Sequence, residues 1–154
     1  MSTKNTSNAI LSTSSSSDQV KGISVVIRIR PFNKRELSFL EKDPSLAQNQ
    51  TNYYSLSSDS TSIRLDKKQY TFDQVYDIET NQQDFYTNTT SKLVKACLCG
   101  YTGTVLAYGQ TGSGKTFTMS GNEKNTQTMG ILQRALTELF ETLQDNNKYK
   151  SFSI

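Results

Sequence analysis

The segment Gly109-Gln110-Thr111-Gly112-Ser113-Gly114-Lys115-Thr116 decides the fold class of this 154-residue chain. It matches G-x-x-x-x-G-K-[ST] at every fixed position, which is the pattern of a loop that surrounds a phosphate group. Glycine permits backbone angles that turn consecutive N–H groups toward one anion. A helix that begins at Lys115 adds unpaired N–H donors and the positive end of its dipole. We call these residues the phosphate loop and predict that they bind a nucleotide.

Two side chains of the phosphate loop have roles that follow from their chemical type. Lys115 supplies a full positive charge to the β- and γ-phosphates, and the Thr116 hydroxyl is placed to coordinate Mg²⁺. Lys115 and Thr116 are therefore the predicted catalytic residues, Thr116 is the predicted metal ligand, and ATP and Mg²⁺ are the predicted cofactors. The predicted phosphate-binding residues are Gly109, Gln110, Thr111, Gly112, Ser113, Gly114, Lys115 and Thr116.

The segments on both sides of the phosphate loop have the order that such a site needs. Thr104–Tyr108 is a compact apolar run between two glycines, which is typical of a strand buried on both faces. A helix is expected from Lys115 to Ser120, and Gly121–Asn125 interrupts it. Helical spacing of apolar residues returns over Ile131–Leu143, and we interpret that stripe as core packing.

The N-terminal part of the chain shows further local patterns. Ile23–Pro31 has β-branched residues in near alternation, which predicts a strand that the proline ends. A short helix is expected next, capped by Asn33 and Glu36. Gln82–Cys99 has one apolar helical face, and Gly100 follows it where a left-handed C-cap belongs.

Tyr53–Phe72 predicts small antiparallel strands, with turns at Ser57–Ser60 and Asp66–Lys68. Strands and helices thus follow one another in an order that fits an α/β fold, with helices packed on a central sheet.

Composition divides the chain into two parts and narrows the function classes. Met1–Val20 contains 12 Ser, Thr and Asn residues, and we predict a disordered tail over 1–20 and one domain over 21–154.

No secretory signal, presequence or membrane span is expected, which predicts a soluble cytosolic protein. The net charge of +3 argues for no nucleic-acid partner. Without histidine, Cys97 and Cys99 do not suggest a zinc site, and we expect buried free thiols.

Around the phosphate loop the sequence resembles the motor domain of kinesins. Ala107–Met119 is similar to the phosphate-loop signature of that family. Thr102 departs from the family pattern, which has Asn there, and Gln133 stands where proline is usual. Four other segments resemble kinesin signatures in the right order, namely Ile27–Phe32, Tyr70–Tyr76, Gly100–Thr104 and Gly130–Ala135.

The resemblance implies a kinesin-like motor core of the P-loop NTPase class, with a central, mostly parallel sheet flanked by helices. It implies an ATPase that microtubules stimulate and that couples hydrolysis to movement along them, in the cytoplasm and on the cytoskeleton. It further implies that Arg28 and Pro31 border the adenine and that Tyr86 stacks on it. From the residues alone, Arg28 and Arg30 could equally form a solvated strand face, and Tyr86 would be core packing.

The chain lacks the two switch sequences of kinesins, N-x-x-S-S-R-S-H and D-L-A-G-S-E, and only 39 residues follow Lys115. We therefore expect the N-terminal part of a motor domain that ends in mid-fold, as a strand begins at Phe152–Ile154, and that is inactive alone. We also expect the reading frame to continue into both switches. The alternatives are a short nucleotide-binding or interaction module without motor activity, and another phosphate-loop enzyme such as a GTPase, although the guanine-reading N-K-x-D is absent.

Overall fold

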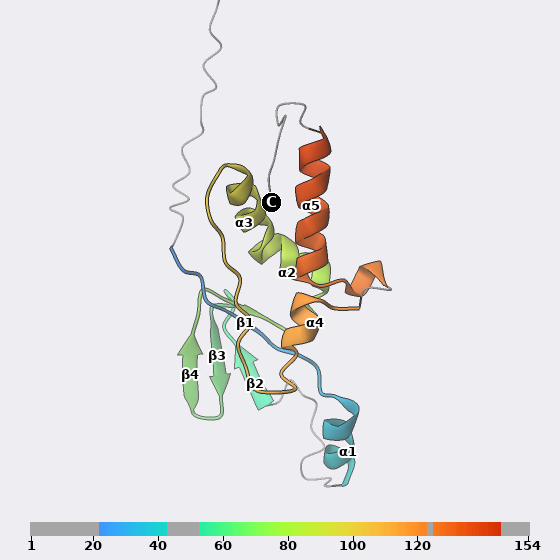
Figure 1. The fold of residues 1–154 in the computed structure, drawn as a ribbon. Helices are drawn as coiled ribbons and strands as arrows, with labels where there is room; N and C mark the ends of the chain where they lie inside the picture. Colours follow the sequence, from blue (N-terminus) through green and yellow to red (C-terminus); the bar gives the residue numbers. More distant parts are fainter. Residues whose placement is uncertain (1–21, 43–52, 123–124, 146–154) are drawn as a thin grey trace, which may run out of the picture.

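The computed structural model describes residues 22–42, 53–122 and 125–145 (Figure 1). The predicted tail at Met1–Val20 and the predicted strand at Phe152–Ile154 lie outside these residues. Figure 1 shows α2, α3 and α5 together at one end, the strands and α1 toward the other, and α4 between them. The elements are β1 (Val26–Arg28), α1 (Lys34–Lys42), β2 (Tyr54–Leu56), β3 (Ser62–Leu65), β4 (Lys68–Thr71), β5 (Gln74–Tyr76), α2 (Gln82–Thr89), α3 (Ser91–Leu98), α4 (Lys115–Met119), the 3-10 turn η2 (Thr126–Thr128) and α5 (Ile131–Asp145).

A short parallel ladder joins the predicted first strand to the segment before α2. β1 pairs with β5 in parallel, with Ile27 opposite Val75 and Arg28 opposite Tyr76. The β-branched residues of both strands favour this pairing, and Val75 is buried. Ile29 extends the ladder by donating its N–H to the Tyr76 carbonyl at 2.9 Å. This pairing fixes the direction in which the chain leaves β1, and it therefore fixes the positions of the residues that follow the strand.

The second sheet is antiparallel and has the strand order β2-β3-β4, as the sequence predicts. Both predicted turns are confirmed, because Ser60 and Asp66 adopt left-handed backbone angles, with φ of 54° and 53°. The Tyr54 hydroxyl of this sheet donates a hydrogen bond to Asp77, just after β5. The two sheets are thus linked at the end of β5. Together with the flanking helices they give the α/β organisation that the sequence predicts.

The expected buried strand at Thr104–Tyr108 is wrong for the described structure. The segment does not form a strand, Leu106 is 87% exposed and Tyr108 is fully exposed. Only Val105 packs partly against the core. A strand buried on both faces needs a neighbour on each edge, and in the described ranges the parallel sheet consists of β1 and β5 alone. The apolar pattern is present, but the pairing that would bury it is not.

The predicted single helix at Gln82–Cys99 forms as two helices, α2 and α3, that meet at Thr90. The predicted cap after it is confirmed, because Gly100 has φ of +91° and its N–H donates to the Cys97 carbonyl at 2.9 Å. The cysteines are free thiols, as expected, but Cys97 and Cys99 are exposed rather than buried. They lie at the end of α3, where the described structure offers little to cover them.

The core lies where α2, α3 and α5 meet. Phe85, Tyr86 and Ile131 form its buried cluster. The Tyr86 hydroxyl and the Ser91 hydroxyl both donate to the Glu138 carboxylate, so a polar contact fixes α5 against the other two helices. Burial and the neighbouring carboxylate raise the pKa of Tyr86 above its ordinary value, so it stays a donor. Core packing is confirmed for one side of the α5 stripe, whereas Leu132, Leu136 and Phe140 remain exposed.

Gly130 marks the point where the loop after α4 returns to that helix. Its N–H donates to the Ser120 carbonyl at 3.1 Å, and a Cβ placed on it would lie 2.4 Å from the Met119 carbonyl oxygen. That oxygen belongs to backbone and cannot move away as a flexible side chain would. The close return of the chain therefore requires glycine at this position.

We expect Gly130→Ala to lower the free energy of unfolding by about 1–3 kcal/mol, because the added methyl group forces the backbone apart. Urea unfolding followed by circular dichroism measures the change. Gly22→Ala is the matched control, since a Cβ there meets nothing within 4 Å, and its effect should stay within about 0.5 kcal/mol. Equal unfolding midpoints for wild type and Gly130→Ala would contradict the close packing described above.

Candidate functional site

The phosphate loop forms a tight turn that runs directly into α4. The Ser113 N–H donates to the Gln110 carbonyl at 3.1 Å and closes the turn. Gly114 precedes α4 with φ of 96°, and its carbonyl accepts the Thr118 N–H at 2.9 Å. The left-handed angle at Gly114 is costly for any residue with a side chain. The glycine pattern noted in the sequence therefore produces the expected loop and the expected helix start.

Gly109 allows the two ends of the loop to approach each other. It has φ of +150°, and a Cβ there would lie 2.5 Å from the Ser113 hydroxyl oxygen. The Ser113 side chain would have to turn away from that methyl group, and residues with a side chain rarely adopt a φ of this size. The backbone conformation at this position therefore favours glycine.

The Lys115 ammonium lies across the inside of the closed loop. Its Nζ donates to the carbonyls of Gly109 and Gln110, both at 2.8 Å. Both partners are neutral dipoles, so the positive charge is held in place without being neutralised. A phosphate that enters the loop would replace these two carbonyls as the acceptor of the Lys115 ammonium, and the resulting charge-assisted hydrogen bond is stronger than a bond to a neutral acceptor.

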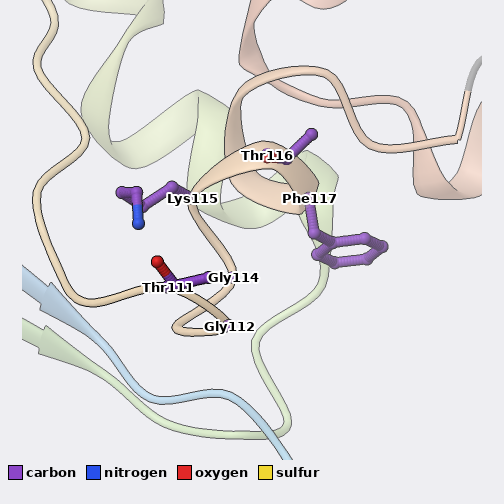
Figure 2. A pocket seen from close by; sticks show the side chains of 6 residues that line it. All are labelled: Thr111, Gly112, Gly114, Lys115, Thr116 and Phe117. Atoms are coloured by element: carbon purple, nitrogen blue, oxygen red, sulfur yellow. The ribbon is translucent and has the colours of Figure 1, made fainter.

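A cavity of about 310 Å³ opens beside this charge. Figure 2 shows the Lys115 amine and the Phe117 ring on opposite sides of the first turn of α4. The lining contains no acidic side chain, and Phe117 is 48% exposed. Lys115, Thr116 and Phe117 thus border one space, with the amine and the aromatic ring on different sides of α4. The lining residues are Thr111, Gly112, Gly114, Lys115, Thr116 and Phe117.

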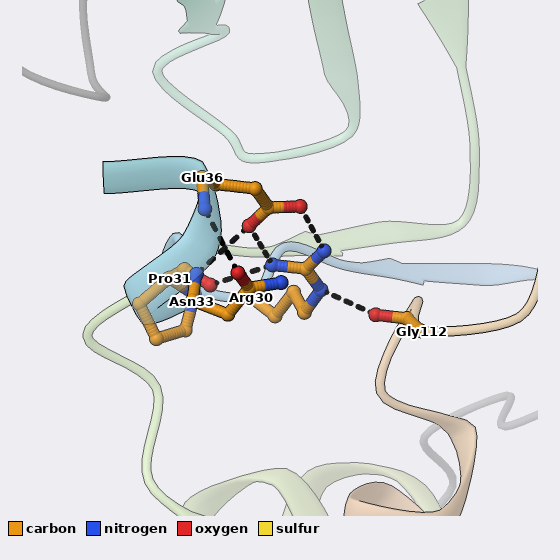
Figure 3. Close-up of polar contacts among 5 residues, drawn as sticks. All are labelled: Arg30, Pro31, Asn33, Glu36 and Gly112. Atoms are coloured by element: carbon orange, nitrogen blue, oxygen red, sulfur yellow. Dashed lines mark hydrogen bonds and ion pairs between the residues drawn. The ribbon is translucent and has the colours of Figure 1, made fainter. Parts of the chain in front are cut away.

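Arg30 connects the phosphate loop to the first turn of α1 (Figure 3). Its Nε donates to the Gly112 carbonyl at 2.8 Å, and its Nη1 and Nη2 donate to Glu36 at 2.7 and 2.6 Å. Glu36 also accepts the Asn33 N–H at 2.8 Å, and Asn33 accepts the Glu36 N–H at 2.9 Å, so the predicted capping box is confirmed. These bonds, those from Arg30 first, lower the pKa of Glu36 from 4.5 to about 2. The cap of α1 and the support of the loop are therefore one network.

Arg28, two residues before Arg30, makes a different set of contacts. Its guanidinium donates to Gln82 at 2.7 Å and to Thr118 at 3.1 Å, and it lies over the Phe85 ring at 4.5 Å. The Phe117 ring is also near, at 5.7 Å. Partial burial lowers the pKa of Arg28 from its ordinary value. Arg28 does not line the cavity but lies one aromatic ring away from it.

The other two residues predicted to contact adenine lie outside the cavity lining. Pro31 is exposed, and its carbonyl accepts a bond from Arg30 at 2.9 Å. Tyr86 is 4% exposed in the core, so neither face of its ring is open to a base. The aromatic residue that does border the cavity is Phe117, which no pattern in the sequence singled out. Its position directly after Thr116, in the first turn of the predicted helix, was the available signal.

Two negative findings apply to the described ranges. Among residues 22–42, 53–122 and 125–145, no group of three or more His, Cys, Asp and Glu side chains could hold a metal ion. The search for membrane-spanning helices in the same part of the chain found none with the necessary length and apolarity. Thr116, the predicted magnesium ligand, is exposed at the cavity.

Comparison with known proteins gives a consistent result. The model of the kinesin motor domain matches residues 28–154. The chain is 35% identical to kinesin-related protein 4 of Dictyostelium discoideum over 84% of its own length, and 36% identical to human kinesin-like protein KIF15 over 88%. It is 33% identical to the kinesin-1 heavy chain of Rattus norvegicus over 86%. It spans 6%, 10% and 13% of these three relatives, respectively.

We expect the stabilising effect of Glu36 to depend on pH. Its pKa is depressed in the folded chain, so its contribution is present above about pH 4.5 and is lost as the pH falls toward 2. Glu36→Gln should therefore lower the urea midpoint at pH 7, and the difference from wild type should shrink progressively below pH 4.5.

The matched control is Glu41→Gln, an exposed change on the same helix, which should have little effect at either pH. A difference between wild type and Glu36→Gln that stays constant from pH 7 to pH 2.5 would show that the ion pair with Arg30 does not form.

Proposed function

The chain belongs to the kinesin motor domain family, and from this premise we propose that it is the ATP-binding part of a microtubule-based motor. The observation that carries the proposal is the Lys115 ammonium, held by two carbonyls at the edge of the cavity that the phosphate loop lines. The whole protein would couple ATP hydrolysis to movement along microtubules in the cytoplasm. Tubulin and ATP are the proposed partners.

The phosphate part of the cavity fits a nucleoside triphosphate. Its one lining cation can contact the β- and γ-phosphates, while the N–H groups of Gly114, Lys115 and Thr116 can bind their oxygens. Thr116 offers an exposed hydroxyl, the kind of ligand that shares Mg²⁺ with phosphates and water. When bound, the metal would neutralise charge on the phosphates. We propose Lys115 and Thr116 as the catalytic residues of this chain.

The base part of the cavity is proposed to lie at Phe117. Its ring is half exposed and borders the same space as Lys115, so a planar base can stack on it. Arg28 would act on the base through this ring, and the exposed Pro31 would border the adenine from the end of the segment after β1. The burial of Tyr86 argues against direct stacking there. We propose Tyr86 instead as a support of α5.

Residues 1–154 alone are proposed to bind ATP without hydrolysing it at the rate of a motor. Phosphoryl transfer depends on groups that position water and metal, and neither switch sequence occurs in the chain. The cavity lining likewise contains no carboxylate. The proposal treats this chain as the phosphate-binding part of a larger catalytic arrangement.

Lys115→Ala should weaken ATP binding by about 10- to 150-fold, because a hydrogen bond to a charged group contributes roughly 1.5–3 kcal/mol. Titration of the full-length protein with a fluorescent ATP analogue measures the loss. Lys92→Ala removes an exposed lysine of α3 and is the matched control, with no change expected. Equal affinities for wild type and Lys115→Ala would mean that the phosphate loop is not the nucleotide site.

We expect purified residues 1–154 to show no phosphate release that microtubules stimulate. The assay compares release from ATP with and without microtubules, at low salt and at high salt. Weak filament binding that disappears with added salt agrees with the proposal, because screening removes non-specific charge attraction. Stimulated turnover by the isolated chain would overturn the proposed inactivity. Nucleotide binding by a full-length protein that never engages filaments would favour the alternative, a nucleotide-binding module without motor activity.

A further inference from the structure

Gln82 is a buried polar side chain that joins several segments near the cavity. It is the first residue of α2 and is 4% exposed. Its Nε2 donates to the Phe117 carbonyl at 2.7 Å and to the Thr128 carbonyl at 3.3 Å. Its Oε1 accepts the Arg28 Nη1 at 2.7 Å. The amide therefore links β1, α2, α4 and the turn at η2.

The contact with Phe117 reaches an element that lines the cavity. The Phe117 carbonyl lies near the end of the five-residue α4, where helix carbonyls lose their intrahelical partners. Gln82 supplies the missing donor and so fixes the backbone from which the Phe117 ring projects. Through Arg28, which lies 5.7 Å from the centre of that ring, Gln82 also fixes a neighbour on one side of the aromatic group.

Core packing alone does not require this arrangement. An apolar residue of similar size would fill the space, but it would leave the Phe117 carbonyl without its donor and would remove the shortest of the hydrogen bonds that hold the Arg28 guanidinium. Both partners act on the one aromatic residue of the cavity lining. The amide of Gln82 thus fixes the orientation of the Phe117 ring, in addition to filling space between the helices.

We propose that Gln82 is a positioning residue for the base of the bound nucleotide, acting through Phe117 and Arg28. The inference rests on the proposed function, in which the phosphate loop binds the triphosphate and Phe117 stacks on the base. Stacking depends on the orientation of the Phe117 ring and on its distance from the base, whereas phosphate binding depends on Lys115 and the phosphate loop. Loss of Gln82 should therefore weaken binding of a ligand that has a base and spare one that has only phosphates.

The test compares two ligands, ATP and inorganic tripolyphosphate, on the full-length protein by isothermal titration calorimetry. Gln82→Leu should weaken ATP binding by about 2- to 12-fold, the effect of one lost neutral hydrogen bond. Tripolyphosphate affinity should stay within twofold. Gln82→Met is measured in parallel, because the unbranched methionine side chain adapts to irregular space and can give a folded variant where Gln82→Leu does not fold. Gln83→Leu, an exposed change at the next position of α2, is the matched control and should leave both affinities unchanged.

A double-mutant comparison shows whether Gln82 acts through the ring. Phe117→Ala should weaken ATP binding by about 5- to 150-fold, as expected for the loss of a base-stacking ring. Gln82→Leu added to Phe117→Ala should cause no further loss, because the ring that it positions is already absent. Additive losses would overturn the proposed route through Phe117.

The outcomes separate the two levels of the proposal. Equal weakening of ATP and tripolyphosphate by the Gln82 variants, or no weakening of ATP, would overturn the positioning role while the nucleotide site stands. A wild-type protein that binds neither ligand, or a Lys115→Ala variant that binds both normally, would overturn the proposed function itself. Thermal unfolding of each variant confirms that only folded protein enters the comparison.

Discussion

Arg30 donates from Nε to the carbonyl of Gly112 and, through its two other nitrogens, pairs with Glu36, so one guanidinium ties the phosphate loop to α1. A glycine-rich loop has few regular backbone bonds of its own, and it keeps one shape only where neighbouring groups hold it. Arg28, two residues earlier, reaches α2 and α4 instead, through Gln82 and Thr118. Arg28 at the end of β1 and Arg30 just after it thus contact the site on two sides. Their positions follow from the pairing of β1 with β5.

The parts of the structure that the sequence predicts well are those that nearby residues determine. The phosphate loop follows from glycines within one short segment, and the cap of α1 follows from Asn33 and Glu36, three residues apart. Gly100 stops a helix because of its own backbone freedom. In each case the pattern and the interaction involve the same few residues. No distant segment has to be placed first.

The expected strand that is wrong, and the choice of the aromatic residue that contacts the base, both depend on segments far apart in the chain. Thr104–Tyr108 has the composition of a buried strand, but burial requires neighbours on both edges, and composition does not supply them. Tyr86 and Phe117 are both aromatic residues on predicted helices near the phosphate loop. Which of them faces the cavity is decided by Glu138 on α5, which binds the Tyr86 hydroxyl and keeps that ring in the core. The helical stripe of the sequence predicts core packing for Tyr86, and the position of Phe117 directly after Thr116 places that residue beside the loop, but neither pattern identifies Glu138 as the partner.

The two halves of the proposed nucleotide site therefore rest on different physics. The phosphate half uses charge and main-chain dipoles, which the loop sequence almost fully determines and which salt weakens. The base half uses the face of Phe117, and its orientation depends on a buried amide, Gln82, that no motif marks. A change in packing around α2 could alter preference for the base without touching the phosphate loop. In the proposed site, Lys115 binds the phosphates, and the buried, neutral Gln82 adjusts the position of the base.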